Sequence, residues 1–168
     1  MPQYFGKYRG TVVNNIDPMQ MGRIMAQVPD VSNVIPSTWA MPCVPFAGIQ
    51  SGHFVVPAIG SGVWIEFEHG DADYPIWTGG YWGSAAEVPA LALAGVPGLQ
   101  SIVIQTTTQN TLMISDTPGP TGGILLKTAT GAMIAINETG ITISNGQGAT
   151  ILMNGPIVNV NAGALQVI

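Results

Sequence analysis

The fold is decided by a series of short segments that begins with Ser101-Ile102-Val103-Ile104-Gln105 and continues in the same rhythm to Ile168. In each segment two apolar residues are separated by one other residue, and the pairs recur every 7 to 12 residues. Side chains alternate along a strand, so both members of a pair lie on the same side. The pairs are Ile102/Ile104, Leu112/Ile114, Ile124/Leu126, Ile134/Ile136, Ile141/Ile143, Ile151/Met153, Val158/Val160 and Leu165/Val167.

The spacing of these pairs is typical of short strands in a sandwich, a barrel or a β-solenoid. Turn residues such as Asn, Gly, Pro and Thr separate the pairs, and from Leu99 onward only Asp116, Lys127 and Glu138 are charged. A monomeric sandwich of this size would show a charged outer face. Two inward residues per strand also cannot enclose a core within one chain.

We therefore predict an all-β fold that ends in an intertwined triple-stranded β-helix, formed by three identical chains over residues 101–168. The alternative is a β-sandwich or β-roll closed within one chain. The predicted trimer core consists of Ile102, Ile104, Leu112, Ile114, Ile124, Leu126, Ile134, Ile136, Ile141, Ile143, Ile151, Met153, Val158 and Val160.

The composition of the 168 residues limits the possible partners. Charged residues make up 8% of the chain, apolar residues 46%, and the net charge is −5. The basic residues are only Lys7, Arg9, Arg23 and Lys127. Nucleic acid is therefore an improbable partner, because binding it requires many cations that neutralise phosphates. Low charge with high apolar content indicates a surface that is largely buried between chains.

Other features of the sequence bear on the compartment. Cys43 is the only cysteine, so an intrachain disulfide is impossible. The start, Met1-Pro2-Gln3-Tyr4, lacks the basic and apolar order of a secretory signal, and we expect synthesis in the cytoplasm without a signal peptide. The sequence has no apolar run of about 18 residues or more that could span a bilayer.

The first 86 residues contain all four Trp and have a different character. Five short strands are predicted there, and five strands in fewer than 90 residues fit a small Greek-key barrel such as the OB-fold. The strands are Tyr8 to Val13, Gly22 to Val28, Thr38 to Val44, Val63 to Glu68 and Pro75 to Trp82. Residues 1–86 are thus the predicted OB-fold domain, residues 87–100 an apolar linker, and residues 101–168 the β-helix.

Several motifs in this first domain carry a family resemblance. They are Gly10-Thr11-Val12-Val13, Asp17-Pro18, Met21-Gly22-Arg23-Ile24, Val28-Pro29, the block from Pro57 to Asp71, Tyr74-Pro75-Ile76-Trp77 and Gly79-Gly80-Tyr81-Trp82. Together they resemble the OB-fold domain of phage baseplate assembly protein V and of VgrG, the central spike of type VI secretion. The resemblance covers about the first 85 residues.

The resemblance implies an OB-fold followed by a trimeric β-helix, in the spike of a contractile injection machine. Such a spike is a structural protein of a phage tail or a phage-tail-like particle, and it meets a target membrane only when the machine fires. The OB-like strand begins within ten residues of Met1, so we expect the hub to be a separate protein on the N-terminal side. The apolar linker is expected to pack against neighbouring chains or, alternatively, against its own barrel.

The C-terminus bears on the tip of such a spike. Some family members end in a metal-bound apex that resembles a His-x-His pattern, but this chain has no His after His69. Three apolar ends would leave open strand edges, which proteins normally cover. We predict a flat face that binds a PAAR-type tip protein, formed by Ala164, Leu165, Gln166, Val167 and Ile168. The alternative is that the three ends taper and seal themselves.

We expect no cofactor, no metal and no catalysis. The only dense polar cluster surrounds His69-Gly70-Asp71-Ala72-Asp73, near Glu66 and Glu68, and it is typical of a solvated hairpin tip. Asp71 and Asp73 match the D-x-D of some sugar transferases, but the pattern is too short to be specific. The second hypothesis for function is a carbohydrate-binding OB module on a trimeric stalk, in which Trp39, Trp64, Trp77 and Trp82 would stack on sugars.

Overall fold

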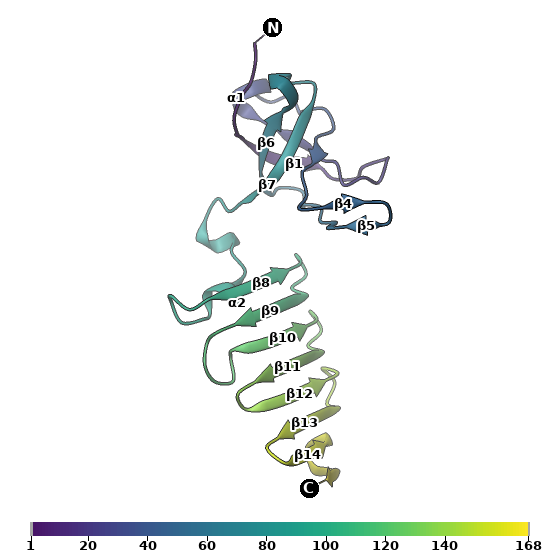
Figure 1. The fold of residues 1–168 in the computed structure, drawn as a ribbon, viewed down its shortest axis with the longest axis vertical. Coiled ribbons are helices and arrows are strands. Elements are labelled where there is room, and N and C mark those ends of the chain that lie inside the picture. The colour runs from purple at the N-terminus through teal and green to yellow at the C-terminus, as the bar shows by residue number, and fades with distance from the viewer. Residues whose placement is uncertain (1, 168) are drawn as a thin grey trace. The chain divides into compact units, whose positions relative to one another are not determined.

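The computed structural model describes the backbone of residues 2–167 and the side chains of residues 2–165. The chain divides into two compact units, Met1–Glu87 and Val88–Ile168 (Figure 1). Nearly all regular structure is β-strand, and the longest α-helices, α1 (Pro29–Ser32) and α2 (Ala90–Leu93), have four residues each. The all-β prediction is confirmed.

The first unit contains a five-stranded sheet in the order β2-β1-β6-β7-β3. Its strands are β1 (Tyr8–Asn14), β2 (Met25–Gln27), β3 (Met41–Pro42), β6 (Gly62–Phe67) and β7 (Pro75–Tyr81). β3 runs parallel to β7, and the other neighbours are antiparallel. An antiparallel bridge closes the two edges, since the Ala40 N–H donates to the Ile24 carbonyl at 2.7 Å. This closed barrel is the predicted OB-fold.

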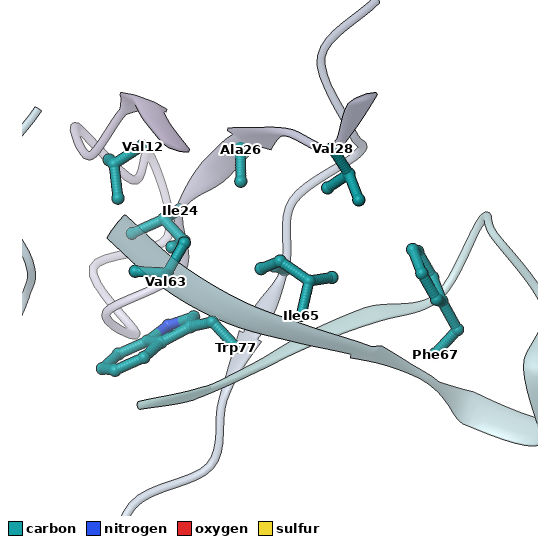
Figure 2. Packing of buried hydrophobic residues seen from close by; sticks show 9 residues of the cluster. Val12, Ile24, Ala26, Val28, Val63, Ile65, Phe67 and Trp77 are labelled. Carbon is teal, nitrogen blue, oxygen red and sulfur yellow. The ribbon is translucent and has the colours of Figure 1, made fainter. Parts of the chain in front are cut away.

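The barrel is filled by inward-facing residues of its strands (Figure 2). In β6 the odd-numbered residues are buried and the even-numbered ones are partly exposed, which is the period-two pattern of a strand with one face on a core. The indole N–H of Trp77 donates to the Gly22 carbonyl at 3.1 Å, so the one polar group of this side chain is satisfied. The buried hydrophobic residues are Val12, Ile24, Ala26, Val28, Ala40, Val63, Ile65, Phe67 and Trp77.

A small hairpin between β3 and β6 is not anticipated by the sequence. It consists of β4 (Ala47–Gly48) and β5 (Ser51–Gly52), joined by the turn Ile49-Gln50. The turn lacks the Asn-Gly or Asp-Gly pair that usually announces a tight hairpin, and each strand has only two residues. The hairpin projects away from the barrel sheet (Figure 1).

The second unit is one eight-stranded antiparallel sheet in which every strand pairs with its neighbours in sequence (Figure 1). The strands are β8 (Ser101–Gln105), β9 (Thr111–Ser115), β10 (Gly123–Lys127), β11 (Met133–Asn137), β12 (Gly140–Ser144), β13 (Thr150–Asn154), β14 (Ile157–Val160) and β15 (Leu165–Val167). Each predicted apolar pair therefore lies in a strand of its own. The residues between them form the connecting turns.

The pairing differs in one respect from the intertwined winding that the spacing suggested. In an interleaved β-helix, strands of the other chains would separate consecutive strands of one chain. Here consecutive strands bond to each other, and two of the connections, Glu138-Thr139 and Gly155-Pro156, are two-residue hairpin loops. The single chain thus forms a complete sheet that needs no partner strand between its own strands.

The segment before this sheet contains α2, whose residues lie against β8. The Thr117 hydroxyl accepts a hydrogen bond from the Val96 N–H at 3.4 Å, and the Asp116 N–H donates to the Gln100 carbonyl at 3.0 Å. The expectation was packing on neighbouring chains or on the chain's own barrel. The structure shows this segment against the sheet that follows it, where Leu91 and Met113 line one groove. Packing on neighbouring chains remains a prediction.

Candidate functional site

The candidate site is one face of the C-terminal sheet, on which the first seven apolar pairs and Leu165 lie in register, and the backbone of Val167 keeps the same register. Ile102 lies opposite Ile114, which lies opposite Ile124, and the second members match in the same way. The first column is Ile102, Ile114, Ile124, Ile136, Ile141, Met153, Val158 and Val167. The second column is Ile104, Leu112, Leu126, Ile134, Ile143, Ile151, Val160 and Leu165. These columns define the paired-column face.

The paired-column face is bare in the single chain. Ile104 is 60% exposed, and Ile136, near the middle of the sheet, is still 42% exposed. When isoleucines alternate with polar residues along a strand, the face that carries the isoleucines is normally packed against a core. A continuous apolar strip of this length on a protein surface marks an interface.

The opposite face has a different composition and is partly covered. Its central column runs Val103, Met113, Leu125, Ala135, Thr142 and Leu152, and polar or small residues flank it. Met113 is only 5% exposed, and Leu91 and Ala94 from the α2 segment line the same groove as Met113. The sheet therefore has one face that its own chain partly covers and one that it leaves open.

The predicted tip residues lie in and before the last strand. Ala164 and Leu165 are exposed, and β15 pairs only with β14, which leaves its outer edge unpaired within the described part of the chain. The backbones of Gln166 and Val167 belong to β15, although their side chains are not described. Ile168 lies outside the described residues.

The polar cluster around His69 is engaged in local hydrogen bonds. The Asp71 carboxylate accepts the Asp73 N–H at 3.0 Å, which fixes the turn before β7. Glu66 forms an ion pair with Lys7 at 2.7 Å on the outside of the barrel. Across residues 2–167, no three His, Cys, Asp or Glu side chains are grouped closely enough to hold a metal ion.

The tryptophans of the barrel are mostly occupied by their own chain. Trp77 is in the core, and Trp39 carries the Arg23 guanidinium 5.5 Å from its ring centre. Trp64 packs on Tyr81, and the Arg9 guanidinium lies over both rings. Of the four residues predicted as a sugar platform, only Trp82 is largely exposed.

One structural ion pair was not predicted from the sequence. The Asp17 carboxylate, only 4% exposed, accepts hydrogen bonds from the Arg23 side chain at 2.7 and 3.0 Å. It also accepts the backbone N–H groups of Met19, Met21 and Arg23. The Arg23 guanidinium, with these N–H groups, holds the pKa of the Asp17 carboxyl far below its usual range. This network fixes the loop between β1 and β2.

Comparison with known families now accounts for both units. Residues 8–82 match the family model of the type VI secretion system/phage-baseplate injector OB domain. Residues 101–166 match that of the phage baseplate V C-terminal trimerisation domain. The chain belongs to the phage baseplate V family. No curated protein matches it.

The boundaries of the two matched ranges lie at the ends of strands or one residue from them. The OB match begins at β1 and ends one residue beyond β7, and the trimerisation match begins with β8. The second match supports a homotrimer and covers both columns of the paired-column face except Val167. Both matched domains are structural parts of a baseplate, so the baseplate V protein is a component of a phage-tail-like particle.

No helix of the described baseplate V chain is long and apolar enough to cross a membrane. The sequence did find the residues of the paired-column face, because their period-two signal is strong. It did not find the Asp17–Arg23 pair, although both residues stand in the motifs that carry the family resemblance.

Proposed function

We propose that this chain is the central spike of a contractile injection machine and acts as a homotrimer without enzymatic activity. The observation that carries the proposal is the paired-column face, which is aligned over eight strands and open in the single chain. Three such faces turned toward a common axis would form a triangular column. Each layer of that column would contain two apolar side chains from each chain.

The burial of this face supplies the driving force for assembly. Full burial of an exposed Ile or Leu stabilises by about 1.5–3 kcal/mol, so completing the burial of a half-exposed one contributes about 1 kcal/mol. The fourteen predicted core residues would together contribute on the order of 10–15 kcal/mol per chain. That gain is comparable with the entropic cost of association, estimated at roughly 4–15 kcal/mol.

The same architecture suits a spike mechanically. The strands of each sheet are stacked one after another, and the hydrogen bonds between neighbouring strands run along the direction of stacking. An axial load would therefore act along many hydrogen bonds in three sheets at once. The few charges of this unit, Asp116, Lys127 and Glu138, would leave a shaft with a weakly charged outer surface when the spike pierces an envelope.

Two partners follow from this role. The exposed Leu165 and the unpaired edge of β15 would be covered by a tip protein of the PAAR type, because open apolar strand edges normally are. A separate hub protein would bind on the N-terminal side of the spike. The tip site would comprise Ala164 to Ile168, the hub site a surface of the OB unit.

The experiment that tests the trimer is sedimentation equilibrium of the full chain at micromolar concentration. The sedimenting species is expected to contain three chains, and a stable folded monomer would contradict the proposal. The tip site is tested by comparing the full chain with one cut after Asn161 in a pull-down by the particle's tip protein. Equal capture of both forms would place the tip site elsewhere.

A further inference from the structure

The β4–β5 hairpin of the OB unit carries an apolar surface that the barrel does not use. Ile49 at its tip is 97% exposed, and the large hydrophobic residues Phe46 and Phe54, which flank the two strands, are also exposed. The ring of Phe54 lies close to Gly22, so the base of the hairpin adjoins the loop between β1 and β2. We define the hairpin patch as Met21, Met41, Phe46, Ile49 and Phe54, all of them exposed.

The turn of the hairpin breaks the usual preferences for such a position. Tight hairpin turns favour Asn, Asp and Gly, whereas here a β-branched Ile49 is followed by Gln50 at a φ of 55°. An unfavourable local choice with no gain in the barrel indicates that the residue serves a contact outside it. Two-residue strands also form a weak hairpin by themselves, and a partner surface would support it.

The size and charge of the patch suit a protein–protein contact. Its exposed side chains present on the order of 600 Å² of apolar surface, which approaches the roughly 800 Å² that each partner buries in a standard interface. Residues 41–59 contain no Lys, Arg, Asp or Glu. A membrane-binding hairpin would normally be flanked by basic residues, so another protein surface is the better match.

A concave surface on the same unit complements the hairpin tip. This groove has a volume of 740 Å³ and is lined by Ile59, Tyr81 and Trp82 among others. Ile59 and Trp82 are each more than half exposed, and Glu87 is the only charged residue in the lining. Contact between the hairpin tip and the groove would therefore bury no charged side chain other than that of Glu87, and burying a charge is costly.

We propose that the hairpin patch of one chain docks into the groove of the next chain, so that three OB units form a closed ring. A projecting tip and a groove on one surface produce a head-to-tail contact, and a threefold axis closes such contacts into a ring. This inference rests on the proposed trimer, which places three OB units at the ends of short segments. Tethers of that length give effective concentrations of about 1 mM or more, so a second copy is the partner always at hand.

The test uses full-length chains in which Cys43→Ser removes the native thiol. Ile49→Cys is combined with Ile59→Cys, the protein is mildly oxidised, and a non-reducing gel is run. The expected result is a ladder of covalent dimers and trimers, because only disulfides between chains raise the mass of the band on the gel. The matched control combines Ile49→Cys with Val34→Cys, since α1 lies away from the hairpin (Figure 1) and Val34, two residues beyond α1, is exposed. That pair should remain monomeric on the gel.

The outcomes separate this contact from the trimer itself. Sedimentation of the unoxidised protein as a monomer would overturn both the proposed function and the ring. A trimer that yields no ladder would overturn the ring alone, as would Ile49→Cys reacting with a maleimide as fast as a free cysteine does. In either of those results the hairpin would be open to a different protein. Covalent dimers from Ile49→Cys alone, which has one thiol per chain, would show that the hairpin tips meet one another and would overturn the groove.

Discussion

Replacing Ile136 by Asp tests whether the paired-column face is the trimer core. Ile136 lies opposite both Ile124 and Ile141, in the middle of the first column, and is 42% exposed in the single chain. A single chain should tolerate the carboxylate at this open position. A trimer would bring three carboxylates together in an apolar column, where each would be desolvated and repelled by the other two.

The magnitude follows from the number of copies. Each substitution removes about 1 kcal/mol of apolar burial and adds a cost of several kcal/mol for burying an unpaired charge. Over three chains the loss is on the order of 10 kcal/mol or more, which should abolish the trimer at micromolar concentration. Because burial raises the pKa of a carboxyl group, assembly should partly recover as the pH falls and the three groups become protonated.

The matched control is Leu152→Asp. Leu152 is 37% exposed and lies on the opposite face of the same sheet, so the change in chemistry and exposure is nearly the same. Sedimentation equilibrium and thermal melting should show a normal trimer for this variant and a monomer for Ile136→Asp. If Ile136→Asp still forms a trimer with unchanged melting, or if Leu152→Asp disrupts assembly equally, the assignment of the inner face is refuted.

Three further outcomes are expected. Asp17→Asn should lower the melting temperature of the OB unit. Because the pKa of Asp17 is depressed in the folded state, its contribution to folding stability is present above about pH 4 and is lost as the pH falls. The variant should therefore lose less stability in acid than the wild type. Ile24→Ala, in a fully buried position of the barrel, should reduce the free energy of unfolding by about 2–5 kcal/mol in denaturant titration. Gly140→Ala should destabilise the sheet by more than Gly148→Ala in thermal melts, because both glycines have positive φ but only at Gly140 would the new methyl meet the Met153 carbonyl. Equal losses at the two glycines would contradict the close approach.

Much of the fold could be predicted because its signals are local. Each apolar pair, such as Ile134/Ile136, marks one strand, and the five barrel strands stand out as short β-prone segments between turns. The β4–β5 hairpin could not be predicted, since its strands are two residues long and its turn residue Ile49 reads as a core residue. The short helix α2 was missed for a similar reason, because four residues are too few to show a helical period.

The candidate site was predictable in its residues but not in its pairing. Period two shows that Ile134 and Ile136 share a face, but nothing in one strand states which strand lies beside it. The intertwined and meandering arrangements place the same residues on the same face and differ only in which backbone groups bond to each other. Loop length decides at two places: the connections Glu138-Thr139 and Gly155-Pro156 leave no room for a strand of another chain, so Asn137 pairs with Gly140 and Asn154 with Ile157. The other connections are longer, and their pairing does not follow from length. Each chain completes its own sheet, and in the proposed trimer the chains would associate through side chains. In the proposed trimer the paired-column face carries the contacts between chains, so substitutions on it should change assembly without unfolding the strands that carry it.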